Sequence, residues 1–301
     1  PPERIRVEPP DTDRNAYEWQ TVGSHVTWGC GNAVKAAALD VRDKMFETVR
    51  RVHGFPKESL YLEDQCVKCK SKPDFKIAFK DFVISGIQTP HGNFLGGPIL
   101  GSGMFMPEFT SATGDPETSQ GGHPNVHYTV GAAAVKLEID KRTGKMRVLK
   151  ATLAVDAGKA INPDLVKGQV TGGMVQGLAT ALYEDIRYGL DGKLLNANFT
   201  DYKIPTAMDI PDEIVPIIIE VPQPDGPFGA RGVGEHTMIP AAPIVANAVE
   251  DALGVRMKSM PITAEKLALA LEGIDYESVK GKTMGLCFMG EADKYKFKTG
   301  K

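Results

Sequence analysis

Apolar positions in the first third of the chain predict one long amphipathic helix. Between residues 31 and 53 they recur at steps of three and four, with charged residues between them, at Val34, Ala38, Val41, Met45, Val49 and Val52. Asn32 is a suitable N-cap for this helix, and Gly54 is expected to end it. A second helical pattern covers residues 164–184, and Asp156 and Asn162 before it are typical of turn and capping residues with a structural role. Its four interior glycines each cost about 0.5–1 kcal/mol relative to alanine, which favours close packing against a neighbour or ligand.

Alternating apolar and polar residues predict strands in the second half. Residues 128–155 have the pattern of a β-hairpin with its turn at residues 141–144, and residues 213–221 form an apolar strand. We predict two further helices, Pro240–Leu253 closed by Gly254, and Ala264–Leu271 capped by Thr263 and ended by Gly273.

The order of these elements shows no regular βαβ rhythm and no linker. It therefore favours an α+β fold with one domain over residues 1–273. Residues 274–301 are then a C-terminal extension and a candidate for contact with a partner chain. Residues 88–125 form a long segment rich in Gly, Pro, Ser and Thr, typical of a functional loop or one that covers an interface.

Glycines cluster at residues 92–103, 168–177 and 226–234, and the last cluster ends in Glu235. Glycine allows close approach of the backbone, so this run leaves a single acid facing whatever lies against it. Glu235 is thus a candidate catalytic base. The residues alone leave a second interpretation open, because acids are also common at a turn before a helix.

Composition excludes several classes of protein. A net charge of -3 provides no basic field for nucleic acid, and no apolar stretch reaches the roughly 20 residues of a membrane span. Four cysteines are too few for a disulfide framework, so we expect a reducing compartment, the cytoplasm. Neither GxGxxG nor a P-loop is present, which argues against a stand-alone nucleotide-binding module.

The cysteine and histidine patterns do not predict a metal site. Cys66 and Cys69 form a single CxxC pair, whereas a zinc site needs four ligands, so we expect solvent-exposed thiols. Three histidines flank the long glycine-rich segment and are expected on the surface, with a substrate channel as the alternative: His91, His123 and His127. His236 follows Glu235 and is placed to tune it.

Four segments carry a more specific signal when taken in order. They are DTD…TVGSHVT…GNAV in residues 11–34, DAGKAINP…GQVTGGMVQGL in residues 156–178, DYKIPT in residues 201–206, and GPFGARGVGE…ANAVEDALG in residues 226–254. Together they resemble the xanthine dehydrogenase and aldehyde oxidase family of molybdenum hydroxylases. The resemblance covers roughly residues 3–272 and is to the distal half of the molybdopterin-binding domain of the large subunit.

The resemblance implies a chemistry. In this family a glutamate takes the proton from a metal-bound hydroxide, water-derived oxygen is inserted at an electron-poor carbon, and two electrons leave through the pterin. It implies that Glu235 is the base, in a pocket that excludes water. It implies that Val22 and Gly23 border the substrate pocket, an N-heteroaromatic compound or an aldehyde being the expected substrate. The cofactor-binding residues implied are Gly23, Ser24, His25, Val26, Thr27, Asn32, Gln169 and Gly234.

The resemblance also implies cofactors and partners. The cofactor is molybdopterin with molybdenum, expected in the cytosine dinucleotide form, and the metal takes no ligand from the protein because the pterin dithiolene holds it. Two upstream motifs of the family, a GGxFG-type loop and GQG, are absent here. We therefore expect a split subunit that needs a second molybdopterin-binding chain, an iron–sulfur subunit and a flavin subunit carrying FAD. The alternative is a non-catalytic scaffold or maturation homologue of the same fold.

Overall fold

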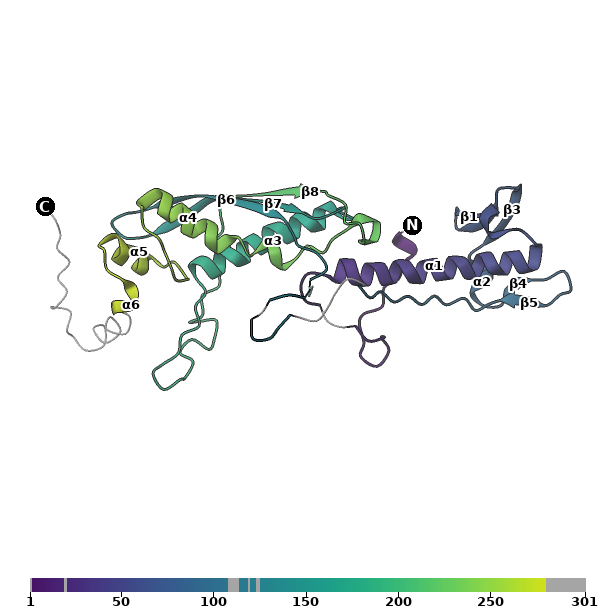
Figure 1. Ribbon diagram of the computed structural model, residues 1–301, viewed down its shortest axis with the longest axis horizontal. Helices are drawn as coiled ribbons and strands as arrows, with labels where there is room; N and C mark the ends of the chain where they lie inside the picture. The colour runs from purple at the N-terminus through teal and green to yellow at the C-terminus, as the bar shows by residue number, and fades with distance from the viewer. Residues whose placement is uncertain (1, 19–20, 108–113, 119, 123–124, 280–301) are drawn as a thin grey trace.

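The computed structural model describes residues 2–18, 21–107, 114–118, 120–122 and 125–279 of the chain. The molecule is elongated, with a sheet and the helices packed beside it in one half and a long helix leading to a small lobe in the other (Figure 1). The main helices are α1 (Val26–His53), α3 (Pro163–Leu182), α4 (Ala241–Leu253) and α5 (Ala264–Leu271), and the short ones are α2 (Lys80–Val83) and α6 (Tyr276–Val279).

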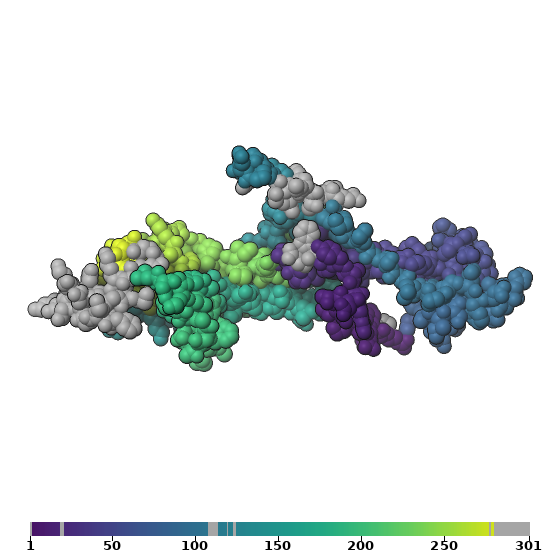
Figure 2. All heavy atoms as spheres, turned by 90° about the horizontal axis from the view of Figure 1, so that it is seen from below, coloured from purple at the N-terminus to yellow at the C-terminus, as the bar shows by residue number. Residues whose placement is uncertain are grey.

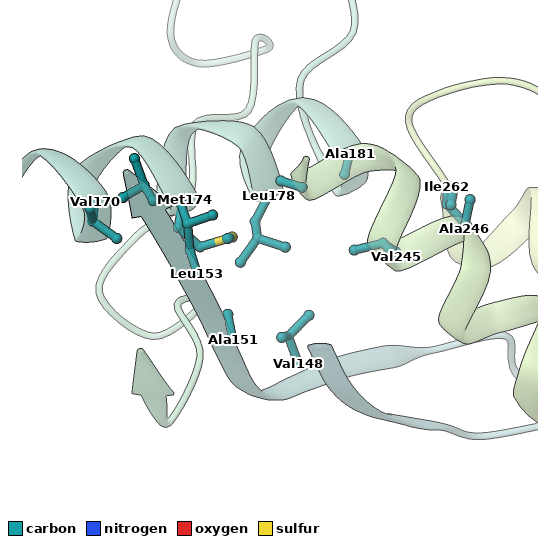
Figure 3. Packing of buried hydrophobic residues seen from close by; sticks show 12 residues of the cluster. Val148, Ala151, Leu153, Val170, Met174, Leu178, Ala181, Val245, Ala246 and Ile262 are labelled. Atoms are coloured by element: carbon teal, nitrogen blue, oxygen red, sulfur yellow. The ribbon is translucent and has the colours of Figure 1, made fainter. Parts of the chain in front are cut away.

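The half of the molecule formed by residues 131–271 is built on a three-stranded sheet. Strands β6 (Gly131–Ile139) and β7 (Met146–Asp156) form the predicted antiparallel hairpin, and β8 (Glu213–Ile219) pairs with β7 in parallel. Helices α3 and α4 pack together on one face of this sheet, and Figure 3 shows their apolar side chains meeting those of β7. The buried apolar residues of these elements form one cluster, which we call the sheet core. Its fully buried members include Ala151, Val170, Met174, Ala181, Ala241 and Val245.

The predicted helix signals of this half are confirmed. Asn162 caps α3, its side chain accepting a hydrogen bond from the backbone N–H of Leu165 at 3.2 Å. Thr263 caps α5 in the same way, and Gly254 ends α4 in the left-handed conformation with φ of 70°. These caps satisfy backbone groups that a helix end would otherwise leave unpaired.

The other half of the molecule is organised around α1, which has 28 residues. Its C-terminal part packs against a lobe of short elements, namely β1 (Leu60–Glu63), β2 (Cys66–Cys69), β3 (Lys72–Ala78), α2, β4 (Gly86–Gln88) and β5 (Phe94–Gly96). This lobe core buries Met45, Val49 and Phe82 and contains none of the residues of the sheet core. The predicted end of α1 at Gly54 is confirmed, with φ of 76°.

The segment after β5 runs along α1 before it leaves the body of the molecule. A Cβ at Gly101 would lie 2.4 Å from the carbonyl oxygen of Ala37, and one at Gly103 would lie 2.2 Å from that of Ala33. Only glycine can pass so close to a helix backbone. The blue-teal described residues beyond this contact stand away from the rest of the molecule (Figure 2). None of the helices that the structure describes combines the length and apolarity needed to cross a membrane.

Candidate functional site

Glu235 lies at the start of a short 3-10 helix, η4 (Glu235–Thr237), directly after the glycine run. It meets Ser24, which comes just before α1. The Ser24 hydroxyl donates to Oε2 of Glu235 at 3.0 Å and accepts from the backbone N–H of Glu235 at 2.8 Å. Two segments separated by more than two hundred residues thus form one site.

The glycines next to Glu235 are required by this contact. A Cβ at Gly232 would lie 1.4 Å from the carbonyl oxygen of Ser24, and one at Gly234 would lie 2.9 Å from its Oγ. Ser24 itself has φ of 56° and follows Gly23 with φ of 65°. A serine in this left-handed region is strained, so the surrounding contacts must hold it there. The close backbone approach predicted for the glycine run is therefore made, within this chain, to Ser24.

A cavity of about 300 Å³ opens beside the Ser24–Glu235 contact. It brings together most of the residues that the sequence suggested for cofactor or substrate: Val22, Ser24, Val26, Thr27, Gln169, Gly234 and Glu235. Gly23, His25 and Asn32 do not line it, although Gly23 and His25 belong to the same turn. The cavity draws on the turn before α1, the N-terminal half of α3 and the glycine run, three segments far apart in the sequence.

Helix α3 supplies Gln169 and holds η4. The glycines at 173 and 177 face the neighbouring loop, because a Cβ at Gly173 would lie 1.8 Å from Oγ1 of Thr237 and one at Gly177 would lie 2.3 Å from the carbonyl oxygen of Met238. Close packing is confirmed for these two glycines. Gly168 and Gly172 instead have no heavy atom within 4 Å of a built Cβ, so that part of α3 borders open space.

A second cavity, of about 480 Å³, shares Thr27, Gln169 and Val233 with the first. It is lined largely by apolar side chains for which no role in a site was predicted, including Val34, Ile161, Leu165 and Phe228. The Lys35 ammonium lies 5.3 Å from the centre of the Phe228 ring. Phe228 is 74% exposed, although it lies inside the glycine run that ends in Glu235.

The prediction that Asn32 is an N-cap is wrong. Helix α1 begins at Val26, with His25 at its N-cap, so Asn32 lies inside the helix. Its amide donates to the carbonyl oxygen of Asp225 at 2.7 Å and ties α1 to the loop before the glycine run. The N-terminus of α1 has no side-chain cap, which leaves its first backbone N–H groups available to an anion.

The surface position expected for His127 is also wrong. His127 packs edge-on against the buried Trp28, with ring centres 5.8 Å apart. Its Nδ1, the Nε2 of His236 and the Nε1 of Trp28 are buried without a hydrogen-bond partner among the described residues. Burial lowers the pKa of both histidines, and for His236 the neighbouring Glu235 partly opposes this effect. His91 is exposed as expected, and His123 lies outside the described residues.

Two further expectations need correction. The Glu235 side chain is exposed in this chain, so the described residues alone do not form a pocket that excludes water. The thiols of the CxxC pair are not exposed either. Cys69 is buried in β2 with its Sγ 3.1 Å from Oγ of Ser71, and Cys66 is half-buried. The described residues contain no cluster of metal-ligating side chains.

The molybdopterin cofactor-binding domain family matches residues 1–211, and the chain belongs to this family. The nicotine 6-hydroxylase large subunit of Paenarthrobacter nicotinovorans is 32% identical over 281 residues, which cover 91% of this chain and 32% of that protein. The 6-hydroxypseudooxynicotine dehydrogenase complex subunit gamma of the same organism is 36% identical over 152 residues, covering 50% and 19%.

Solved structures agree with this assignment. The crystal structure of a Cu,Mo-CO dehydrogenase in its carbon monoxide reduced state matches with a TM-score of 0.70 and 26% identity, over 87% of this chain and 31% of that chain. The predicted family and the α+β fold of its molybdopterin-binding domain are confirmed. The chain spans about one third or less of the length of these proteins.

Proposed function

We propose that this chain forms the Glu235 side of the active site of a molybdenum hydroxylase. The observation that carries the proposal is the Ser24–Glu235 contact at the edge of a cavity lined by the predicted cofactor segments. When bound, the molybdenum–pterin group supplies two-electron oxidation and reduction. Glu235 accepts the proton that leaves the water-derived oxygen as this oxygen bonds to an electron-poor carbon of the substrate.

The residues around the cavity fit such a group. The uncapped N-terminus of α1, the hydroxyls of Ser24 and Thr27 and the amide of Gln169 are donors suited to phosphate and pterin oxygens. The site also depends on the absence of a side chain at Gly234, where a Cβ would lie 2.9 Å from Oγ of Ser24. We include Gly23, His25, Val26 and Asn32 as supporting residues of the same turn and helix.

Ser24 has a defined part in this proposal. By donating to Oε2 it fixes the carboxylate, and no hydrogen bond from the described residues occupies Oε1. Oε1 is therefore the oxygen that receives the proton. Val22 also lines the cavity, and we assign it to the wall that faces the substrate.

The exposure of Glu235 supports the proposed partners. A base in this chemistry works in a site closed to water, so further protein must cover the cavity. We assign this cover to the part of a large subunit that this chain does not span, with an iron–sulfur subunit and a flavin subunit as electron acceptors. The names of two relatives, a complex subunit gamma and a large subunit, support a multi-subunit enzyme. The nicotine hydroxylase favours an N-heteroaromatic substrate over an aldehyde.

Replacing the base tests the proposal. In the assembled enzyme, Glu235→Gln keeps the size of the side chain and removes its basicity. We expect about one molybdenum per copy of this chain, release of CMP on acid hydrolysis of the cofactor, and a fall in turnover of about 10²–10⁴-fold. Turnover within threefold of the unaltered enzyme would overturn the role of Glu235, and a fully matured complex without molybdenum would overturn the whole proposal.

A further inference from the structure

Arg231 and Asp156 form a buried ion pair between the glycine run and the end of strand β7. The Arg231 Nη1 lies 3.0 Å from Oδ2 of Asp156, and the two side chains are only 11% and 10% exposed. The other charged pairs of the described residues are more exposed at one or both partners. Sequence motifs suggested only a structural turn at Asp156 and nothing for Arg231.

Each partner of this pair makes additional contacts that fix its geometry. The second oxygen of Asp156 accepts from the backbone N–H groups of Gly158 and Val221, at 2.9 and 3.1 Å. The Nε of Arg231 donates to Oε1 of Gln223 at 2.9 Å. An arginine fork can hold both acceptors at once, which the single ammonium of a lysine cannot do in the same plane.

Backbone hydrogen bonds join the same two segments as the ion pair. The N–H of Arg231 donates to the carbonyl oxygen of Ala157 at 3.1 Å, and the N–H of Lys159 donates to that of Gly229 at 2.7 Å. The glycine run is thereby joined to the residues that continue β7, a strand whose Leu153 and Val155 are buried in the sheet core.

A second anchor lies on the other side of Glu235. Thr237 is 1% exposed, its hydroxyl donates to the carbonyl oxygen of Gly234 at 2.6 Å, and it packs against Gly173 of α3. Residues 232–236 span the short gap between the two anchors. Two of them are glycines, which have the widest backbone freedom of all residues.

We propose that Arg231 and Asp156 are positioning residues for Glu235. The pair holds the start of the 232–236 segment against β7 so that Glu235 meets Ser24 in one orientation. This inference rests on the proposed function of Glu235. It adds that the orientation of the base is set by an ion pair that lies outside the cavity at Glu235.

The test compares two ion pairs in the assembled, molybdenum-loaded enzyme. Arg231→Lys keeps the charge and loses the fork. We expect kcat to fall about 10- to 100-fold, since displacement of a reacting group by about 1 Å has an effect of this size. KM and molybdenum content are expected to stay within about threefold. The control, Arg147→Lys, alters the exposed pair between Arg147 and Asp212 and is expected to leave kcat unchanged.

Two readouts separate positioning from general support of the fold. Amide exchange of peptides covering residues 226–238 should become at least tenfold faster in Arg231→Lys, with no change in peptides from α4. In a Glu235→Gln background, Arg231→Lys should add little further loss of kcat, because the two changes act through one group. An equal further loss in that background, or unchanged exchange at 226–238, would overturn the inference.

The outcome for Glu235→Gln keeps the two ideas distinguishable. If that variant is inactive while Arg231→Lys has full kcat and unchanged exchange, the positioning role is wrong and the base stands. If Arg231→Lys does not assemble, Gln223→Met takes its place under the same criteria, because it removes one acceptor of Arg231 and keeps the ion pair.

Discussion

The two halves of this molecule bury their apolar residues separately, and the candidate site lies between them. The sheet core is formed by β7, α3 and α4, and the lobe core by the C-terminal part of α1 and the strands packed on it. The turn at Ser24 is at the opposite end of α1 from the lobe, and Glu235 follows a loop fixed to β7. The sheet core therefore positions the base directly, whereas the lobe connects to the site through one helix.

This difference has a consequence for mutations. Damage to the sheet core should reach Glu235 through Gly173, Thr237 and the end of β7. Damage to the lobe should remain local, because its core shares no residue with the sheet core. Three predictions test this contrast, beginning with the junction itself.

The largest effect is expected from Gly232→Ala. The added Cβ would lie 1.4 Å from the carbonyl oxygen of Ser24, so the glycine run and the turn before α1 must separate. We expect kcat of the assembled enzyme to fall by at least about 10²-fold. Gly29→Ala is the matched control, since its Cβ would meet only the His25 ring, at 3.8 Å, and kcat should stay within threefold. Full activity of Gly232→Ala would show that the Ser24 contact is dispensable.

A matched pair of core truncations gives the intermediate effect. Met174 in the sheet core and Phe82 in the lobe core are 0% and 1% exposed. Truncation to alanine should cost about 2–5 kcal/mol at Met174 and about 3–5 kcal/mol at Phe82. Amide exchange measures which region of the molecule each truncation destabilises. Met174→Ala should speed exchange in residues 226–238 and lower kcat, whereas Phe82→Ala should speed exchange in residues 60–88 alone. A loss of kcat in Phe82→Ala equal to that in Met174→Ala would contradict the separation of the two cores.

The smallest effect concerns pH. Burial lowers the pKa of His236 beside the site. It also lowers, with a contribution from Lys72, the pKa of His53, the last residue of α1, whose ring packs against Phe55 and Phe75 of the lobe region. Each histidine binds a proton more readily when unfolded, with a pKa of about 6.5, than when folded. Their contribution to stability is therefore complete above about pH 6.5 and is lost as the pH falls from there through the lowered folded pKa.

Asparagine substitutions at these two positions should remove this pH dependence region by region. Between pH 7.5 and 5.5, the protection of residues 226–238 against exchange, corrected for the intrinsic exchange rate at each pH, should fall less in His236→Asn than in the unaltered protein. His53→Asn should have the same effect only in the lobe. If either substitution alters the pH response of the other region, the two halves are more strongly coupled than their cores indicate.

Local sequence patterns predicted the regular elements well. The hairpin of β6 and β7 follows from alternation, and α3 follows from its apolar positions and from Asn162, because such signals act within a few residues. The start of α1 was misplaced because residues 24–27 lack apolar periodicity, and Asn32 resembles an N-cap while it bonds to Asp225 instead. The lobe strands β1 and β2, which are 4 residues each, are too short for periodicity to reveal.

The sequence motifs named candidate residues whose roles stay predictions, and they missed the contacts that hold these residues in place. Motifs singled out Ser24, Gln169 and Glu235, which the structure brings to one cavity. The pairing of Arg231 with Asp156 depends on how β7 meets the glycine run, and no pattern in the sequence encodes a contact across that distance. The burial of His127 against Trp28 is likewise a tertiary effect.

The glycine contacts along α1 give this helix a mechanical property. With 28 residues it is about 42 Å long, and the segment through Gly101 and Gly103 touches its backbone too closely for it to slide or turn about its axis. Tilting remains possible. A tilt of about 3° around the middle of such a rod would move each end by about 1 Å. A rigid tilt of the whole helix, unlike local loosening of the lobe core, would therefore move Ser24 and with it the carboxylate of Glu235.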